Sequence, residues 1–373
     1  MSNRSKAFFI NGGAGRVLCS IPALEKYERE SGDKDFVIVC EGGMEFYKGH
    51  PTLHKHAYDS WHKGLFENHL KDKDIVSPEP YRVWDYYNQK CSLSEGFDIE
   101  INGRSSEENT ISDPVIKLTK AESIQGYQAI QEIKAGTGKD KVLVIQPFGR
   151  SVVQEDDFIY DPSSRSFELS NINALIYELR TEYAVIIMSE IQIPLEKDNE
   201  HATAQPQIQD IRMWASIISS ADHFLGCDSV GQHIAKAVGT TATIVTGSTY
   251  PINITYPNYE GFDIIDVGEG RREYSPIRIS MDDERDRANN DCISMTPDQE
   301  VEVLESCIKF MGKGELFTGE VNTTKTDSGC CSSGKPVMTD VGTYPTYDMS
   351  KGNAEGLLTS NSAADVMNNN EEG

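Results

Sequence analysis

Between residues 142 and 311 the chain alternates short apolar runs with longer helical patterns, and this alternation limits the possible folds more than any other feature. Strands are expected over 142–145, 184–188, 223–226, 242–246 and 263–267, and helices over 167–180, 211–220, 229–238 and 297–311. Such alternation is typical of a parallel sheet with right-handed crossovers. The second half of the chain is therefore expected to be an α/β domain.

The first half carries a weaker version of the same pattern. A strand over 7–10 leads into a turn with Gly12, Gly13 and Gly15, and a helix follows. A continuous apolar run over 36–40 is typical of a parallel strand covered on both faces. Three further elements are expected, namely a helix over 81–91, a strand over 115–118 and a helix over 121–135.

The pattern predicts two Rossmann-like domains, 1–138 and 139–314, that face each other across a cleft. In open α/β sheets a ligand binds beyond the carboxyl ends of the strands. From residue 315 to residue 373 the sequence is rich in Gly, Ser, Thr and Asn and has no apolar periodicity. This low-complexity tail is expected to be disordered.

Composition narrows the class of protein. The 373 residues include 59 acidic and 35 basic side chains, a net charge of −24, which argues against non-specific binding to nucleic acid or to an anionic membrane. The eight cysteines are scattered without CxxC pairs, as expected for reduced thiols in the cytoplasm. No apolar window approaches the roughly 18 residues of a membrane span, and no signal peptide is apparent.

One segment, residues 224–239, indicates an anion site. Apolar Phe224 and Leu225 end a strand, and Asp228 or Ser229 can cap the helix that follows. The start of a helix offers free N–H groups and the positive end of the helix dipole, so a phosphate is the expected ligand. His233, one turn into the helix, can add a donor. The alternative is that Asp and Ser cap the helix for stability alone.

Several motifs together resemble a known family. They are Gly13-Ala-Gly-Arg-Val-Leu18 before Ile21-Pro-Ala-Leu24, Gln146-Pro-Phe-Gly149, Gly226-Cys-Asp-Ser-Val-Gly-Gln-His-Ile-Ala235, and Thr246-Gly-Ser-Thr249. Over residues 6–311 the chain resembles the heptosyltransferase-type glycosyltransferases of family 9. The resemblance implies the GT-B fold and an inverting, metal-independent transfer of a sugar from a nucleotide sugar, such as ADP-heptose, to a glycan or other acceptor.

The resemblance also assigns residues to the donor. Asp228, Ser229 and His233, together with Gly231, match the element that binds the diphosphate. Gly149 lies in a loop that approaches the donor, with Arg150 or Arg165 as its basic partner. The remaining matches are expected to line the nucleotide pocket without reacting; they are Thr246, Gly247 and Ser248.

The first glycine-rich loop departs from the family at Arg16. The family commonly has Asp at this position, as the base that deprotonates the acceptor, and an arginine cannot take a proton at any working pH. Three explanations stay open. Glu41 or Glu45 can serve as the base instead, Arg16 can bind an anionic acceptor or the leaving diphosphate, or the protein can be a non-catalytic sugar-binding or structural protein.

Two further interpretations compete with a transferase. The glycine-rich turn with Glu41 after the second strand suggests an NAD site, but the full Gly-x-Gly-x-x-Gly order is missing. A histidine cluster suggests a metal, although no carboxylate or thiol recurs with it at a familiar spacing. The cluster comprises His50, His54, His56, His62 and His69. Nearby aromatic side chains could stack on sugar rings or belong to the core: Trp61, Phe66, Trp84, Tyr86 and Tyr87.

Overall fold

The computed structural model describes residues 4–103, 111–155, 158–196, 202–272 and 294–314. All of these residues fall in one compact unit. The low-complexity tail expected over 315–373 lies outside the described residues. Since the described part is a single unit, the domain boundary expected at 138/139 stays a prediction.

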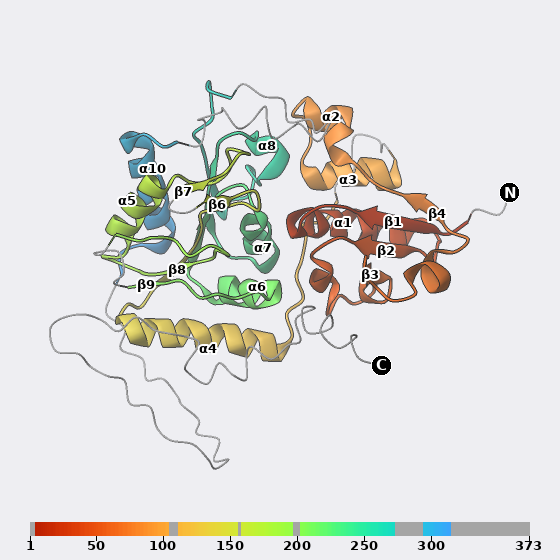
Figure 1. The fold of residues 1–373 in the computed structure, drawn as a ribbon, viewed down its shortest axis with the longest axis horizontal. Helices are drawn as coiled ribbons and strands as arrows, with labels where there is room; N and C mark the ends of the chain where they lie inside the picture. Colours follow the sequence, from red (N-terminus) through yellow and green to blue (C-terminus); the bar gives the residue numbers. More distant parts are fainter. Residues whose placement is uncertain (1–3, 104–110, 156–157, 197–201, 273–293, 315–373) are drawn as a thin grey trace, which may run out of the picture. The chain divides into compact units, whose positions relative to one another are not determined.

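The first half of the chain forms a four-stranded sheet in the order β3-β2-β1-β4 (Figure 1). Its strands are β1 (Lys6–Ile10), β2 (Val37–Cys40), β3 (Ala57–Asp59) and β4 (Asp74–Val76). Every pairing in this sheet is parallel. The carboxyl ends of all four strands therefore lie at one edge, where the loops that begin at residues 11, 41, 60 and 77 follow.

The second half forms a six-stranded parallel sheet in the order β12-β11-β10-β5-β8-β9. Its strands are β5 (Val142–Gln146), β8 (Ala184–Ile187), β9 (Thr203–Ala204), β10 (His223–Gly226), β11 (Ala242–Thr246) and β12 (Phe262–Asp266). Numbered along the chain from β5, the order is 3-2-1-4-5-6, that of a Rossmann fold. The strand order reverses between β5 and β10, and in the first sheet between β1 and β4. These two reversal points are where ligands bind in sheets of this kind.

Helices cover both faces of the second sheet. Residues Val142 and Val144 of β5 join one apolar cluster, and Leu143 and Ile145 join another, because successive side chains of a strand point to opposite faces. One face is covered by α4 (Lys120–Thr137), α6 (Ile211–Ser220) and α7 (Val230–Val238), and the other by α5 (Leu169–Leu179) and α10 (Pro297–Met311).

The first sheet is covered unequally. On one face α1 (Ala14–Glu30) packs beside α3 (Leu93–Asn102), and their apolar residues belong to the same cluster as those of α4, α6 and α7. The other face has a small cluster of Ala7, Val37, Val39 and Leu70. The large shared cluster explains why the described residues form one compact unit.

The predicted α/β fold with two parallel sheets is confirmed, and nearly every strand and helix expected in the second half is present. The strand expected over 115–118 is wrong. That segment is a linker whose backbone binds helices: Ile116 N–H donates to the Ala237 carbonyl over 3.4 Å, and the Lys117 carbonyl accepts from Arg212 over 2.7 Å. The helix expected over 81–91 is reduced to α2 (Trp84–Tyr87) after a 3-10 turn.

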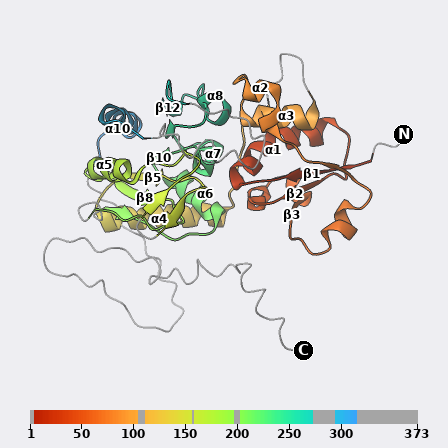
Figure 2. The same cartoon turned by 45° about the horizontal axis from the view of Figure 1, so that its top comes forward.

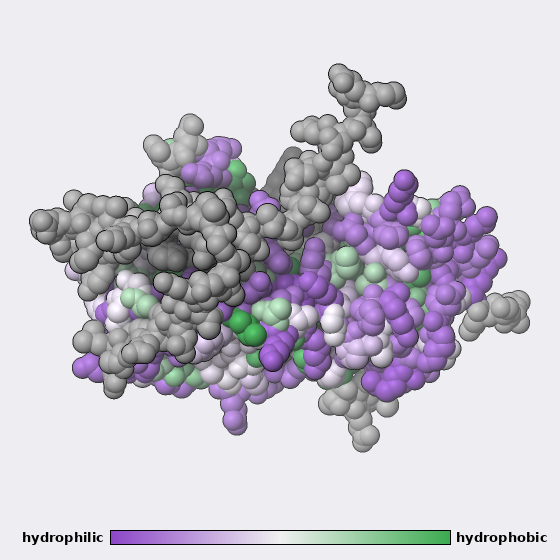
Figure 3. All heavy atoms as spheres, turned by 90° about the horizontal axis from the view of Figure 1, so that it is seen from below, coloured by the Kyte–Doolittle hydropathy of each residue, from purple (hydrophilic) through white to green (hydrophobic). Residues whose placement is uncertain are grey.

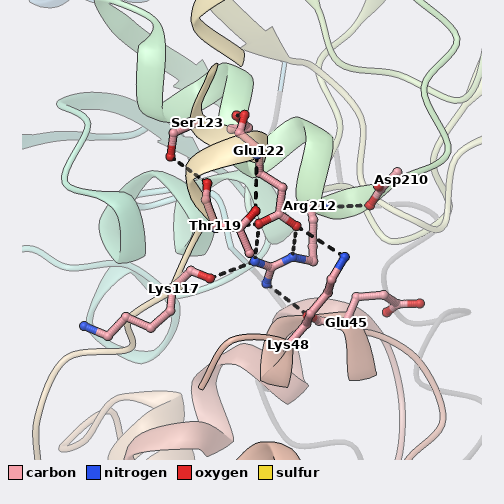
Figure 4. A network of polar contacts seen from close by, with 9 residues as sticks. Glu45, Lys48, Lys117, Thr119, Glu122, Ser123, Asp210 and Arg212 are labelled. Carbon is pink, nitrogen blue, oxygen red and sulfur yellow. Dashed lines mark hydrogen bonds and ion pairs between the residues drawn. The ribbon is translucent and has the colours of Figure 1, made fainter. Parts of the chain in front are cut away.

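A network of polar contacts joins α4 and α6 to the first half (Figure 4). The guanidinium of Arg212 donates to both carboxylate oxygens of Glu122, over 2.7 and 2.8 Å, and to the backbone carbonyl of Glu45 over 3.1 Å. These contacts lower the pKa of Glu122 to about 2, with the Arg212 hydrogen bond as the main cause. Helix α4 also has Gly126 against Ser216 of α6, where a Cβ would lie 2.2 Å from the Ser216 hydroxyl.

The surface and the thiols have ordinary properties. On the face in Figure 3, described residues are mostly hydrophilic and apolar ones appear as small separate patches. None of the helices among the described residues has both the length and the apolar composition needed to cross a bilayer. Five described cysteines are buried and form no disulfide: Cys19, Cys40, Cys91, Cys227 and Cys307.

Candidate functional site

The start of helix α7 follows β10, at the reversal point of the second sheet. The N-cap residue is Ser229, but its side chain accepts no hydrogen bond from the first turn among the described residues. The Gly231 N–H instead donates to the side-chain oxygen of Gln146, at the end of β5, over 2.7 Å. A neutral amide thus ties β5 to α7, and it adds no negative charge at the positive end of this helix.

Gly231 is required for this contact. A Cβ at this position would lie 2.4 Å from Gln146 Oε1 and 2.4 Å from Phe224 Cζ. Gln146 and Phe224 therefore approach the backbone of α7 so closely that a residue with a Cβ at position 231 would clash with both. The glycine of the motif is therefore required for packing.

Asp228 and Arg165 form the charged part of this region. Asp228 is buried and accepts from Gln232 Nε2 over 3.1 Å. The carboxylates of Asp228 and Asp161 raise the pKa of the Arg165 guanidinium against the opposing effect of burial. Arg165 donates to the Ser163 hydroxyl over 2.9 Å and to the Ser151 hydroxyl over 3.1 Å. Arg165 is therefore a fixed cation with two acidic neighbours.

Asp161 organises the loop that holds Arg165. Its carboxylate accepts from the backbone N–H groups of Ser163 and Ser166, over 2.8 and 3.1 Å, and from both of their hydroxyls. The Ser166 hydroxyl in turn accepts from Gly149 N–H over 2.9 Å. The loop after β5 and the segment 161–166 are thereby locked together.

The loop after β11 is held by the same segment. The Ser248 hydroxyl donates to the Ser163 carbonyl over 2.8 Å, and the Gly247 carbonyl accepts from Arg272 over 2.8 Å. Thr246 is buried and its hydroxyl donates to Asp266 over 3.3 Å. These three residues tie the strand ends together, and their expected place in the nucleotide pocket stays a prediction.

His233 lies in the first turns of α7 and is buried. Its Nδ1 is 2.9 Å from the Tyr256 hydroxyl and 3.5 Å from the Cys19 sulfur. Desolvation lowers the pKa of His233 to about 4 and raises that of Cys19 to about 12. His233 is therefore neutral at pH 7, so any contact with a phosphate would be as a neutral donor.

The glycine-rich loop of the first half meets the start of α7. A Cβ at Gly15 would lie 3.2 Å from His233 Cδ2 and 3.7 Å from Val230 Cα, so the first turns of α1 and α7 touch here (Figures 1 and 2). The Arg150 side chain lies over Gly13, with its Nη1 3.6 Å from the position of a Cβ. The two helix starts and Arg150 therefore come together from both halves of the chain.

Arg16 is buried beside this junction. It donates from Nη1 to the Glu79 carboxylate over 3.3 Å and from Nη2 to the Pro78 carbonyl over 3.2 Å. Its guanidinium lies 4.9 Å from the ring centroid of Tyr81. Residues 78–81 follow β4, so Arg16 links the loops after β1 and β4 at the reversal point of the first sheet. Its Nε has no acceptor among the described residues.

The two carboxylates proposed from the sequence as bases differ in position. Glu41 is exposed and accepts from the Gly12 N–H over 2.5 Å, so it stabilises the glycine-rich turn, where Gly12 has a φ of +94°. Glu41 is also the carboxylate that an NAD site would need to bind the ribose, and one of its oxygens is already bound to Gly12. The Glu45 side chain is exposed and points away from Arg212, which binds only its carbonyl (Figure 4).

The five histidines of the first half do not converge. His50 lies 3.0 Å from Glu25, His56 lies 2.8 Å from the Phe36 carbonyl, and His62 and His69 pack around Tyr58. Over the part of the chain that the structure describes, no three His, Cys, Asp or Glu side chains are grouped so that they could hold a metal. Metal independence itself stays a prediction.

The aromatic residues of the first half separate into two kinds. Trp61 and Phe66 are exposed, at 88% and 62% of their surface, and Trp84 is partly covered by Lys90 at 4.3 Å. Tyr86 is buried, and its carbonyl accepts from Asn253 over 2.7 Å. Tyr86 is therefore a core residue, whereas the other three are available at the surface.

Sequence reasoning missed the residues that act through long-range contacts. Gln146 was part of a quoted motif but had no assigned role, and Asp161, Tyr256 and Glu79 were not singled out. Glu79 stands three residues after the short strand β4, which was not predicted. An Asp-Pro-Ser-Ser-Arg-Ser run was the one available signal for the Asp161 turn.

Two solved glycosyltransferases share this fold. The crystal structure of the glycosyl transferase family 9 from Veillonella parvula DSM 2008 matches with a TM-score of 0.56 and 13% identity, over 83% of this chain and 98% of that chain. The ADP-heptose lps heptosyltransferase II of E. coli matches with a TM-score of 0.52 and 12% identity, over 81% of this chain and 98% of that chain. No protein-family model and no curated protein sequence matches this chain. The expected GT-B fold is confirmed.

Proposed function

We propose that this protein transfers a sugar from a nucleoside-diphosphate sugar to a glycan or another acceptor. The observation that carries the proposal is the meeting of two helix starts, α1 and α7, at the carboxyl edges of two parallel sheets with Arg150 beside them. The shared fold of heptosyltransferase II and the family 9 enzyme supports the class of reaction. A heptose-like donor such as ADP-heptose is the first to test.

The donor diphosphate fits the start of α7. Its leaving oxygen gains negative charge as the bond to the sugar breaks, so fixed positive groups stabilise the transition state. The helix dipole supplies one such group and Arg150 another. Arg150 has no acceptor for its guanidinium among the described residues, whereas Arg165 already faces two carboxylates. The positive charge of Arg150 is therefore less compensated by neighbouring carboxylates than that of Arg165, and Arg150 is the stronger candidate to bind the diphosphate.

The reaction that these groups support is an inverting displacement without a metal. The acceptor attacks the anomeric carbon from the side opposite to the diphosphate, and protein cations take the place of a metal at the leaving group. We place the protein in the cytoplasm, where nucleotide sugars are made.

A second candidate function is binding without catalysis. The observation that favours it is Arg16, a buried arginine at the position where the resemblance implies a carboxylate base. A protein of this kind would hold the nucleotide sugar and release it unchanged.

Calorimetry and nucleotide release separate these functions. ADP, UDP and GDP, their sugar conjugates and NAD are titrated into the full chain, and release of nucleotide is followed with and without a glycan acceptor. We expect one nucleoside diphosphate to bind and its sugar conjugate to be consumed. Replacement of Arg150 by Ala should weaken diphosphate binding by about tenfold or more, because a charge-assisted hydrogen bond contributes about 1.5–3 kcal/mol.

The matched control is Arg29→Ala, which removes an exposed arginine from the far end of α1. It should leave binding unchanged. Binding of NAD in place of every nucleoside diphosphate would contradict the proposal, and binding of a nucleotide sugar without transfer or hydrolysis would favour the second candidate.

A further inference from the structure

The reaction proposed above needs a group that takes the proton of the acceptor, and the structure indicates which carboxylate is in place. Transfer to a hydroxyl is fastest when a base within hydrogen-bond reach removes its proton as the new bond forms. The base has to stand in the first half, near the junction of α1 and α7 but on the opposite side of the sugar from the diphosphate. Three carboxylates of strand-end loops come into question: Glu41, Glu45 and Glu79.

Two of the three are poorly placed. Glu41 already binds the Gly12 N–H over 2.5 Å, so one of its oxygens holds the turn. Glu45 belongs to a 3-10 helix whose backbone is fixed by Arg212, and its carboxylate points away from that contact (Figure 4). Neither carboxylate has a cation within 4.0 Å among the described residues.

Glu79 is held where a base is needed. Its carboxylate lies 3.3 and 3.5 Å, oxygen by oxygen, from Nη1 of Arg16. Arg16 follows Gly15, the residue that touches α7 at His233 and Val230. The residue that anchors Glu79 is therefore the next one along α1 after the contact between the two halves, and its side chain lies over Gly12.

The charge of Arg16 and the ring of Tyr81 act on residues near the start of α7. The charges of Arg16 and Asp228 both act on the pKa of Cys19, one from each half of the chain. Tyr81, two residues after Glu79 and in contact with the Arg16 guanidinium, also acts on the pKa of Arg165. The loop after β4 thus borders the residues at the start of α7.

The Glu79 carboxylate is held by Arg16 and is still partly exposed to solvent. The side chain of Arg16 is 8% exposed and that of Glu79 is 33% exposed, so one end of the pair is anchored and the other can meet a ligand. The Glu79 side chain caps no backbone N–H of the 3-10 turn that follows it, within the described residues. Its acceptor capacity is not used up by the fold.

We propose that Glu79 is the general base of the transfer and that Arg16 is a positioning residue that holds it; this rests on the function proposed above. A Glu79 oxygen takes the proton of the acceptor hydroxyl, and the oxygen of that hydroxyl forms a bond to the anomeric carbon. The bond from this carbon to the diphosphate oxygen breaks, and the nucleoside diphosphate leaves with the electron pair. The proton on Glu79 then passes to water.

The role of Arg16 follows from its chemistry. An arginine cannot act as a base, but a planar guanidinium fixed by a backbone carbonyl and an aromatic ring can hold a carboxylate in one orientation. In this account the carboxylate base comes from the loop after β4, as Glu79, and α1 supplies Arg16, which holds it in place.

The test compares three variants of the full chain with the nucleotide sugar that the wild type consumes. Glu79→Gln keeps the size and an acceptor for Arg16 but cannot take a proton, and it should lower kcat by about 10²–10⁴-fold. Its KM for the donor and its affinity for the nucleoside diphosphate should stay within about twofold of the wild type. Glu79→Asp, which keeps the carboxylate, should retain more activity than Glu79→Gln.

The control variant is Glu30→Gln, which removes the carboxylate of an exposed Arg–Glu pair, with Arg29, at the other end of α1. It should keep wild-type kcat. A wild type that transfers sugar while Glu79→Gln keeps its kcat would overturn the role of Glu79 alone. A wild type that binds a nucleotide sugar but never transfers or hydrolyses it would overturn the proposed function, and the role of Glu79 with it.

Discussion

The two helix starts that meet in this protein are built alike and charged differently. Each follows a parallel strand, begins after a tight turn and lies at the reversal point of its sheet. At α7 the turn is tied by a neutral amide, Gln146, whereas at α1 it is tied by two acids, Glu41 bound to Gly12 and Glu79 bound to Arg16.

This difference separates two kinds of ligand. The start of α7 has the buried carboxylate of Asp228 beside it, and the cations Arg150 and Arg165 stand in the same region. At α1 the guanidinium of Arg16 is already paired with Glu79, and Glu41 is bound to Gly12. Positive groups at a helix start favour an anion. Carboxylates are instead what an acceptor hydroxyl needs. This difference supports our proposal that the diphosphate binds to the second half and the acceptor to the first half.

The largest predicted loss of stability comes from replacing Gly231 of α7, and it tests whether the two helix starts differ in packing. Gly231→Ala places a Cβ 2.4 Å from both Gln146 Oε1 and Phe224 Cζ. We expect unfolding free energy to fall by about 2–4 kcal/mol, from overpacking and from loss of the Gln146 bond. Urea unfolding monitored by circular dichroism measures this change.

The corresponding change in α1 serves as the control. Gly15→Ala brings a Cβ to 3.2 Å from His233 Cδ2, and the gain from alanine in a helix, about 1 kcal/mol, offsets this strain. Its stability should stay within about 1 kcal/mol of the wild type. Equal losses for the two variants would contradict the view that α7 alone depends on a glycine for its packing.

A smaller effect is expected from acid. Burial lowers the pKa of His223 to about 3 and that of His233 to about 4, below the value of about 6.5 expected in the unfolded chain. The unfolded state therefore binds these protons first as the pH falls. Stability that is present above pH 6.5 is lost below it, by on the order of 2 kcal/mol for each histidine at pH 5.

Unfolding in urea at pH 7 and at pH 5 measures this loss. His223→Gln should reduce the difference between the two values, whereas His54→Gln, at an exposed histidine, should leave it unchanged. The same loss in His223→Gln as in the wild type would show that His223 is not the neutral residue that its burial implies.

The sequence predicted the second sheet well because its strands are continuous apolar runs between amphipathic helices. The first sheet was harder to predict, since β3 and β4 have only three residues each and their side chains are not fully buried. Without β4, the position of Glu79 at a strand end could not be recognised.

The candidate site was predictable where a local motif carries it. The strand–turn–helix of 223–238 and the loops at Gly13 and Gly149 were placed correctly as strand ends. The partners of Arg16 and Gly231 were not, because Glu79 and Gln146 lie far away in sequence and no local pattern links them. The neutral state of His233 could not be predicted either. It follows from burial of the side chain beside Tyr256 and beside Cys19, which belongs to the other half.

One pair of opposite substitutions tests the central claim most directly. Gln146→Glu adds a charge at the start of α7 and keeps an acceptor for Gly231, whereas Glu79→Gln removes a charge beside α1. Titration calorimetry with the nucleoside diphosphate that binds the wild type gives both affinities. Our account predicts at least about tenfold weaker binding for Gln146→Glu and a change within about twofold for Glu79→Gln. Unchanged binding in Gln146→Glu, or equal weakening in both variants, would contradict it.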